Sequence, residues 1–222
     1  MRLLNSLRQA FSAEHLFLQY QPFVDLASGR IVGAEALLRW KTEEGSFVPP
    51  DRFIPLAEQS GLMVALGDWV MRSALQFLAH LHTQGVRDFR MAINVSHAQF
   101  REPDFIDSLI QAMAAYDIDP SGVEIELTES VAIDNVELIE QKLAALRQVG
   151  VAVAIDDFGT GYSSLNILRR LDIDRLKIDR SFVSGEQCAA DDHGIARMVL
   201  QLASQLGLRT IAEGIETEEQ RQ

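Results

Sequence analysis

Acidic and amide side chains stand at the ends of several apolar segments of this chain, where they could bind cations or move protons. Each segment is a short run rich in Val, Ile, Leu or Ala that stops at a polar residue. The polar residues that could do chemistry lie within these segments or just past their ends: Glu35, Asn94, Glu126, Asp156, Asp157, Lys177, Asp179 and Glu213. Parallel strands place their carboxyl ends on one face of a sheet or barrel, which is where such folds build active sites, so we expect these side chains to converge.

Several carboxylates that converge on one site repel one another. Either some of them take up protons, or divalent cations neutralise them. Carboxylate and amide oxygens are hard ligands, which suit Mg²⁺ or Mn²⁺ better than zinc. The adjacent Asp156 and Asp157 are suited to two metals, and a two-metal site can hold a phosphoryl group and activate water for in-line displacement.

The alternation of residues along the strands supports this interpretation. In 123–130, Glu124 and Glu126 share one face, and in 174–179 Lys177 shares a face with Asp179. Asp156 and Asp157 would point to opposite faces of a continuing strand, so their joint use requires the chain to turn there. The glycines of the following FGTGYSS sequence can supply such a turn.

Any one of these acids, taken alone, is more often a helix cap or a solvated loop residue than a metal ligand. Their coincidence at the ends of separate strands favours a metal-dependent site. The spacing alone does not name a substrate.

The sequence pattern predicts that alternating strands and helices position these residues. Apolar residues at helical spacing fill 61–84 and 134–149. Such alternation with short connections is typical of a parallel α/β domain, and the number of strands favours a TIM-like (β/α)8 barrel. The expected strands are 20–26, 30–40, 90–96, 123–130, 151–157, 174–179 and 208–214.

An eighth strand is absent from the sequence, so we expect a barrel that is incomplete at its C-terminus. Residues 1–19 are expected to form a lead-in helix or linker from an upstream domain, and 20–222 the barrel domain. No run of apolar residues approaches the ~20 needed to span a bilayer.

The charge balance limits the partners. Lys and Arg number 20 and Asp and Glu 32, a formal net charge of −12. That balance argues against a general nucleic-acid binder or contact of this segment with an anionic membrane, because both need basic patches. The single Cys188 cannot form an intramolecular disulfide, which is natural in a reducing, cytoplasmic compartment.

The same residues lie in motifs that resemble the EAL-domain family, the phosphodiesterases of cyclic di-GMP. The likeness runs from about Phe17 to the last residues, and the order and spacing of the motifs make it specific. The motifs are YQP at 20–22, EALLRW at 35–40, FIPLAE at 53–58, NVS at 94–96, ELTES at 126–130, DDFGTGYSSL at 156–165, LKID at 176–179 and AEGIE at 212–216.

The resemblance implies a barrel with two divalent metals at its mouth that cleaves cyclic di-GMP to linear pGpG. It implies that Lys177 holds the attacking water or the phosphate, with Glu35 and Asp156 in the catalytic set, and that Arg39, Gln21 and Glu216 serve the substrate. Glu129 is expected to support the loop 157–165, and Asp179 to support the ligands. The implied metal ligands are Glu35, Asn94, Glu126, Asp156, Asp157 and Glu213.

The resemblance also suggests partners: a homodimer and a linked sensory or GGDEF-type domain upstream. One alternative is a receptor that binds cyclic di-GMP without cleaving it. Such receptors typically lose the EAL Glu, one of the paired Asp residues or the Lys, and Glu35, Asp156, Asp157 and Lys177 are all present. A second alternative is an inactive fragment, because the family continues past AEGIE with a strand that closes the barrel.

Overall fold

The computed structural model describes residues 2–12, 15–133, 136–159, 168–183 and 190–221. The chain divides into two compact units, Met1–Val123 and Glu124–Gln222, and each is described by itself. Within the described residues, no helix is both long and apolar enough to cross a membrane.

The first unit combines three longer strands with helices. Its sheet has the order β1-β2-β4, and the two-residue β3 pairs with β2. Its elements are α1 (Arg2–Ser12), β1 (Leu16–Val24), β2 (Ile31–Lys41), β3 (Phe47–Val48), α2 (Pro50–Gln59), α3 (Met63–Thr83), β4 (Arg90–Asn94), α4 (His97–Arg101), α5 (Phe105–Ala115) and the 3₁₀ helix η1 (Pro120–Gly122).

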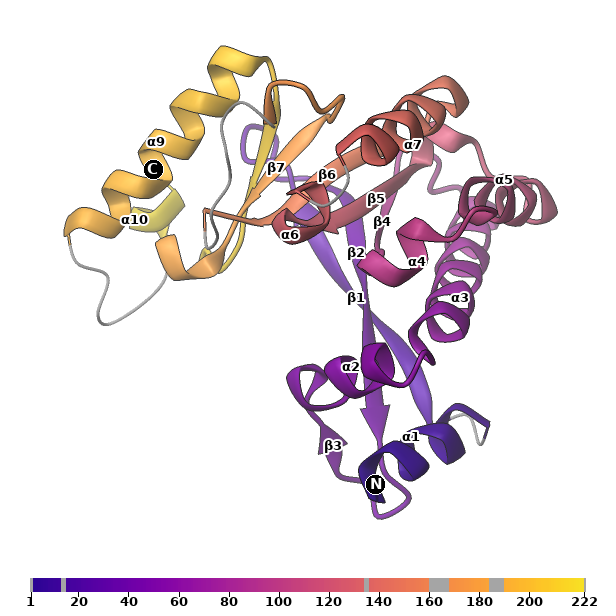
Figure 1. Ribbon diagram of the computed structural model, residues 1–222. Helices are drawn as coiled ribbons and strands as arrows, with labels where there is room; N and C mark the ends of the chain where they lie inside the picture. Colours follow the sequence, from indigo (N-terminus) through magenta and orange to yellow (C-terminus); the bar gives the residue numbers. More distant parts are fainter. Residues whose placement is uncertain (1, 13–14, 134–135, 160–167, 184–189, 222) are drawn as a thin grey trace. The chain divides into compact units, whose positions relative to one another are not determined.

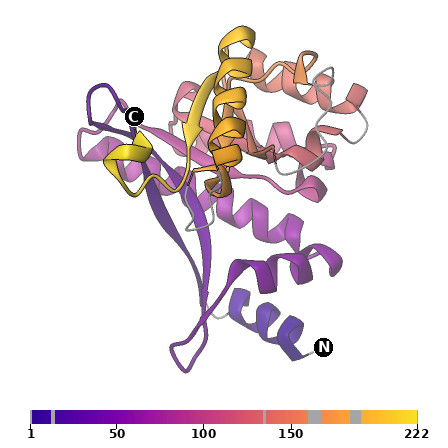
Figure 2. The same ribbon diagram turned by 90° about the vertical axis from the view of Figure 1, so that its left-hand side faces the viewer.

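The second unit is a parallel sheet of order β5-β6-β7-β8. Figures 1 and 2 show α9 running beside β7 and β8, which it contacts. The elements are β5 (Val123–Thr128), α6 (Glu129–Ile133), α7 (Val136–Val149), β6 (Ala152–Phe158), β7 (Arg175–Ile178), the 3₁₀ helix η2 (Arg180–Phe182), α9 (Ala190–Leu206), β8 (Arg209–Ala212) and α10 (Glu218–Arg221).

The first two strands depart from the expected parallel pattern, because β1 pairs with β2 antiparallel. A parallel connection needs a crossover of a dozen or more residues, and only 25–30 are available. Asp25 Oδ1 accepts hydrogen bonds from the backbone N and Oγ of Ser28, and Gly29 has φ 68°, so these residues form a tight turn. These bonds hold the pKa of Asp25 below its usual value.

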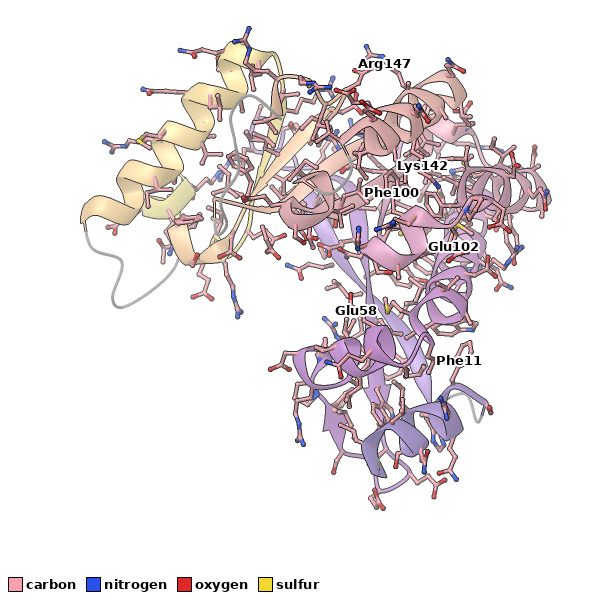
Figure 3. All side chains as sticks on the ribbon, in the orientation of Figure 1. Phe11, Glu58, Phe100, Glu102, Lys142 and Arg147 are labelled. Carbon is pink, nitrogen blue, oxygen red and sulfur yellow. The ribbon has the colours of Figure 1, made fainter. Side chains whose placement is uncertain are left out.

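The long helix α3 organises the core of the first unit. It buries Leu66, Leu75 and Leu78 and contacts β1, β2 and β4. Tyr20 of β1 stacks on Phe77 with ring centroids 3.9 Å apart, and burial raises the pKa of Tyr20 to about 12. Beyond β4, the fully buried Phe100, labelled on α4 in Figure 3, packs edge-on against a phenylalanine of α5.

Both faces of β5 are buried over most of its length. Val123, Ile125 and Leu127 of β5 are fully buried, yet Glu124 and Glu126 between them are no more exposed. Strands of a parallel sheet are normally apolar on both faces. The charged residues on one face of these strands therefore need ion-pair partners inside the protein.

All seven strands expected from the sequence are present, with ends displaced by a few residues. The first begins at Leu16 instead of Tyr20, because its pairing with β2 already starts there, opposite Trp40. The two-residue β3 was not expected, since two residues carry no periodicity. The role of 1–19 as a lead-in segment stays a prediction.

We predict that Gly33→Ala destabilises the first unit. Gly33 pairs with Arg90 of β4, and a Cβ there would lie 2.4 Å from the Arg90 carbonyl oxygen, a backbone atom that cannot move without disturbing the strand pair. Overpacking of this kind costs about 1–3 kcal/mol in the free energy of unfolding. Urea denaturation followed by tryptophan fluorescence would measure it, because both tryptophans, Trp40 and Trp69, belong to this unit.

Gly122→Ala is the matched control. A Cβ at Gly122 would meet its nearest atom, the Phe89 carbonyl oxygen, at 3.5 Å, an ordinary contact. We expect its unfolding free energy to stay within about 0.5 kcal/mol of the wild type. Equal destabilisation by the two substitutions would contradict the close approach of β2 and β4.

Candidate functional site

In the first unit, Glu35 of β2 and Asn94 at the end of β4 lie together on neighbouring strands. Glu35 of β2 is buried, and its Oε1 accepts a hydrogen bond of 2.6 Å from Nδ2 of Asn94. The parallel register pairs Glu35 with Ala92, so Asn94, two residues further along β4, lies on the same face. Two neighbouring strands thus present a carboxylate and an amide side by side.

Two more of the predicted residues flank this pair. Gln21 of β1 is directly opposite Glu35 in the antiparallel register. Arg39, four residues beyond Glu35 on β2, shares its face by the two-residue period. Its guanidinium is held in place: Nε donates to Gln19 Oε1 at 2.9 Å and Nη1 to the Leu38 carbonyl oxygen at 3.0 Å.

Gln19 is a residue that the motif analysis did not single out. Its signal in the sequence is its position two residues before Gln21, on the same face of the alternating strand. By accepting the Nε hydrogen bond of Arg39, Gln19 fixes the direction in which the guanidinium points.

In the second unit, Lys177 is at the centre of three carboxylates. Its ammonium Nζ lies 2.9 Å from Glu126 Oε2, 3.1 Å from Asp156 Oδ2 and 2.9 Å from Glu213 Oε1. Lys177 has no exposed surface and Glu126 only 1%. One ammonium among three carboxylates leaves an excess of negative charge, which favours the binding of further cations.

The two adjacent aspartates occupy a β-bulge. Ile155 pairs with Leu176 and Phe158 with Ile178, so two residues of β6, Asp156 and Asp157, stand opposite the single Lys177 of β7. Asp157 has φ 55°, a left-handed conformation that is uncommon for a residue other than glycine. Its backbone N donates to Asp156 Oδ1 at 2.9 Å.

The bulge explains how the side chains of Asp156 and Asp157 can lie on the same side of the strand. A regular strand would send them to opposite faces, and an extra residue in a bulge cancels that alternation. The sequence places the turn in the glycines after the pair, whereas the structure begins it at Asp157 itself. Gly159, with φ 98°, then continues it.

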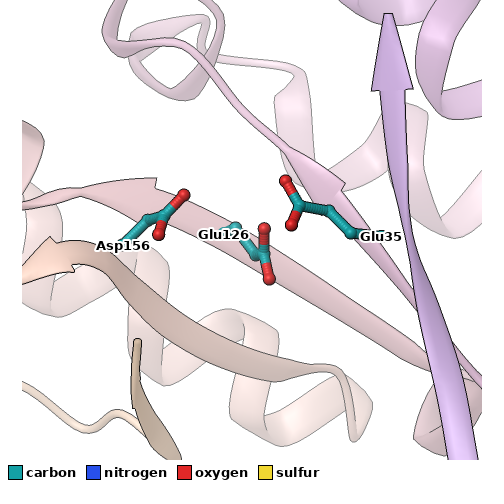
Figure 4. Close-up of side chains that lie close together, drawn as sticks. All are labelled: Glu35, Glu126 and Asp156. Atoms are coloured by element: carbon teal, nitrogen blue, oxygen red, sulfur yellow. The ribbon is translucent and has the colours of Figure 1, made fainter. Parts of the chain in front are cut away.

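Glu126 and Asp156 are placed for shared cation binding. Carboxylate oxygens of the two residues lie within 4.8 Å of one another. Figure 4 draws them projecting from β5 and β6, and it also labels Glu35 of β2. The donors are oxygen atoms of carboxylates, the chemistry that Mg²⁺ and Mn²⁺ prefer, so these residues fit such an ion.

Glu129 makes a contact with the loop that follows the aspartates. Its buried side chain, at the start of α6, accepts a hydrogen bond of 3.1 Å through Oε2 from the backbone N of Gly159. A Cβ at Gly159 would lie 3.1 Å from the ring of Phe182, so the chain passes close to η2 there. The rest of the loop expected at 157–165 lies outside the described residues.

The remaining predicted residues are more peripheral. Asp179 caps η2 by accepting a hydrogen bond of 2.9 Å from the backbone N of Ser181. Glu216 is exposed, and its backbone N donates to Gln220 Oε1. Among the described residues, the structure does not bring either carboxylate to Lys177. Their supporting and substrate-binding roles stay predictions.

A second ion pair, in which the carboxylate is buried, lies beside the Lys177 cluster and was not anticipated. Arg175 Nη1 donates to Oε2 of Glu124, whose side chain is fully buried. Arg175 and Lys177 alternate on β7 as Glu124 and Glu126 do on β5, so the pair repeats the Lys177–Glu126 pair two residues earlier. The matching alternation of charge in the two strands was the signal available in the sequence.

Two curated bacterial proteins are similar in sequence to this chain over nearly its whole length. A cyclic di-GMP phosphodiesterase of Pseudomonas aeruginosa is 44% identical over 216 residues, 97% of this chain and 37% of that protein. MucR of the same organism, a bifunctional diguanylate cyclase/cyclic di-GMP phosphodiesterase, is 39% identical over 222 residues, 100% of this chain and 32% of that protein. The chain spans about a third of the length of these curated relatives.

Solved structures of EAL proteins are also similar to this chain in fold. The PaMucR phosphodiesterase in complex with c-di-GMP has a TM-score of 0.95 at 39% identity, covering 100% of this chain and 90% of that one. The EAL domain of Mycobacterium smegmatis DcpA has a TM-score of 0.78 at 38% identity, covering 92% and 84%. These similarities confirm the predicted fold class, the TIM-like α/β barrel fold of EAL domains. The family model of the EAL domain matches residues 4–222, and the chain therefore belongs to the EAL domain family.

Proposed function

We propose that this chain hydrolyses one phosphodiester bond of cyclic di-GMP and releases linear pGpG, with Mg²⁺ or Mn²⁺ as cofactor. The observation that carries the proposal is the cluster in which Lys177 meets Glu126, Asp156 and Glu213. Membership of the EAL family supports it, as do the names of the two Pseudomonas relatives. A domain that only bound the nucleotide would have no need of this complete set of acidic residues and lysine.

The proposed ligands of two divalent cations are Glu35, Asn94, Glu126, Asp156, Asp157 and Glu213. Bound there, the cations would lower the pKa of a coordinated water and stabilise the charge that develops on the leaving 3′-oxygen. The hydrogen bond from Asn94 Nδ2 orients the Glu35 carboxylate, and the bulge brings Asp157 beside Asp156. Each of these contacts would hold the proposed ligands of its own unit in place before cations bind, which would limit the reorganisation needed on binding.

The cationic side chains have separate roles in this proposal. Lys177 holds the attacking water or the phosphate. Arg39 binds a phosphate oxygen of the substrate through the planar donor arrangement of its guanidinium, with Gln19 fixing its direction. Gln21 and Glu216 contact the nucleotide. The acidic chain thus binds a dianion through its cations and these two basic groups.

We also propose how this chain assembles with a second copy and with an upstream domain. The hydrogen bond between Glu129 and Gly159 would transmit the position of the loop to the metal ligand Asp157, two residues earlier. We propose a homodimer in which this loop takes part, a covalently linked GGDEF-type or sensory domain upstream, and a cytoplasmic location. The bifunctional name of MucR supports the linked domain.

We predict that Glu35→Gln and Asp156→Asn abolish most release of pGpG from cyclic di-GMP in the presence of Mn²⁺. Each substitution removes a charged ligand while keeping the shape of the side chain. Loss of even an outer-shell partner of a metal ligand costs about 10–100-fold in metal affinity or activity, so we expect at least that loss of rate. Chromatography of the products measures the rate.

Glu140→Gln is the control for these variants. Glu140 is a carboxylate of α7 that pairs with Arg170 at 2.8 Å at the surface. Its substitution should leave the rate unchanged. If the wild type binds cyclic di-GMP but forms no pGpG, the hydrolytic proposal fails and a receptor function is supported.

We predict that Arg39→Ala raises KM for cyclic di-GMP about tenfold, because a charge-assisted contact to a phosphate is lost. Arg39→Lys should restore little, since an ammonium cannot reproduce the paired donors. Gln19→Ala should raise KM less, by freeing the guanidinium. Steady-state kinetics would show this order, with Arg147→Ala, an exposed arginine of α7 labelled in Figure 3, as a control of unchanged KM. An unchanged KM in Arg39→Ala would remove Arg39 from the substrate site.

We predict that Asp157 has separable backbone and ligand roles. Asp157→Asn tolerates the left-handed conformation and loses the charge, so stability should stay near that of the wild type while pGpG release falls. Asp157→Ala should also lose about 1–2 kcal/mol of stability, because alanine disfavours φ near 55°. Urea unfolding in EDTA, compared with product release, distinguishes the two roles. Equal stability of the two variants would contradict a backbone role for this residue.

A further inference from the structure

Lys177 contacts the very oxygen atoms that the proposed metal site would use. Glu126 Oε2, Asp156 Oδ2 and Glu213 Oε1 all lie 2.9–3.1 Å from its Nζ. An ammonium has three N–H donors, which matches these three carboxylates in number. Glu126, Asp156 and Glu213 all belong to the proposed ligand set.

Asp156 shows the conflict most clearly. Its Oδ1 accepts the backbone N–H of Asp157, and its Oδ2 faces Lys177. Both oxygens are therefore engaged before any cation binds. A divalent cation at Asp156 must share an oxygen with Lys177 or replace the ammonium there.

Charge makes this competition energetically important. The side chains of Lys177 and Glu126 are at most 1% exposed, so water screens them little. Without the ammonium these three carboxylates, of which Glu126 is fully buried, would lose a shared counter-charge and repel one another more strongly, which destabilises the fold. With it, an incoming divalent cation meets a positive charge only a few Å away.

We propose that Lys177 acts as an internal counter-ion that stabilises the metal-free fold and, by competing for the same oxygens, lowers the affinity of the site for divalent cations. The inference rests on the proposed function in placing a cation at Glu126 and Asp156. It assigns Lys177 a role in cation binding in addition to its role toward water or phosphate.

The ion pair of Arg175 with Glu124 provides a matched control. It joins the same two strands, β5 and β7, on the same face, two residues from Lys177 and Glu126. Neither residue belongs to the proposed ligand set. Substituting Arg175 therefore removes a part-buried cation of the same sheet without removing the competitor for the ligands.

The test is Mn²⁺ binding by Lys177→Met, with isothermal titration calorimetry and thermal unfolding of the chain after EDTA treatment and dialysis. We expect Kd for Mn²⁺ to fall about tenfold or more, because a like charge beside the cation is removed. We expect Tm without metal to fall by about 5–15 °C and the Mn²⁺-induced rise in Tm to increase. Arg175→Met should lower Tm but leave Kd within about twofold of the wild type.

An unchanged or weaker Mn²⁺ affinity in folded Lys177→Met would overturn the inference and make Lys177 a scaffold for the carboxylates. If the wild type binds no Mn²⁺, the metal site of the proposed function fails as well. Crystals of the wild type with and without Mn²⁺ keep the inference testable if the variant does not fold. Lys177 Nζ should move beyond 3.5 Å from at least one of its three carboxylates when Mn²⁺ binds, and retention of all three contacts would contradict the competition.

Discussion

The neutralisation of buried acidic charge is the constraint on which the second unit depends. Glu126 on β5 and Asp156 on β6 reach the same ammonium as Glu213, which follows β8, and that ammonium comes from β7. The ion pairs therefore connect every strand of this sheet on one face. On the opposite face of β7 the apolar Leu176 and Ile178 are buried.

This arrangement explains why the strands tolerate charge at positions that are normally apolar. Burying a lone carboxylate costs far more than a hydrophobic contact returns, and only pairing makes it tolerable. The pairs occur in two successive layers, Arg175 with Glu124 and then Lys177 with Glu126. The first layer connects β5 and β7 away from the proposed ligands, and the second includes the proposed ligand Glu126.

Much of this arrangement of charged residues could be predicted from the sequence, because it follows from the two-residue period of side chains along a strand. Alternation in β5 and β7 placed Glu126 and Lys177 on one face, and the ends of the apolar runs located the strands. The bulge at Asp156 and Asp157 could not be predicted, since a single left-handed φ leaves no periodic signal. The contact of Gln19 with Arg39 also escaped prediction: the short connection 25–30 excludes a parallel pair of β1 and β2, but the exact antiparallel register that brings the two side chains together has no signal in the alternation.

The bulge has a consequence for how this segment can change in evolution. A strand has a parity, in which odd and even positions face opposite sides, and the bulge switches that parity between Ile155 and Phe158. Substitution of either aspartate changes one side chain. Deletion of one residue here would remove the bulge, so every downstream side chain of the strand would point to the opposite face of the sheet. Length at this point is therefore as constrained as residue identity.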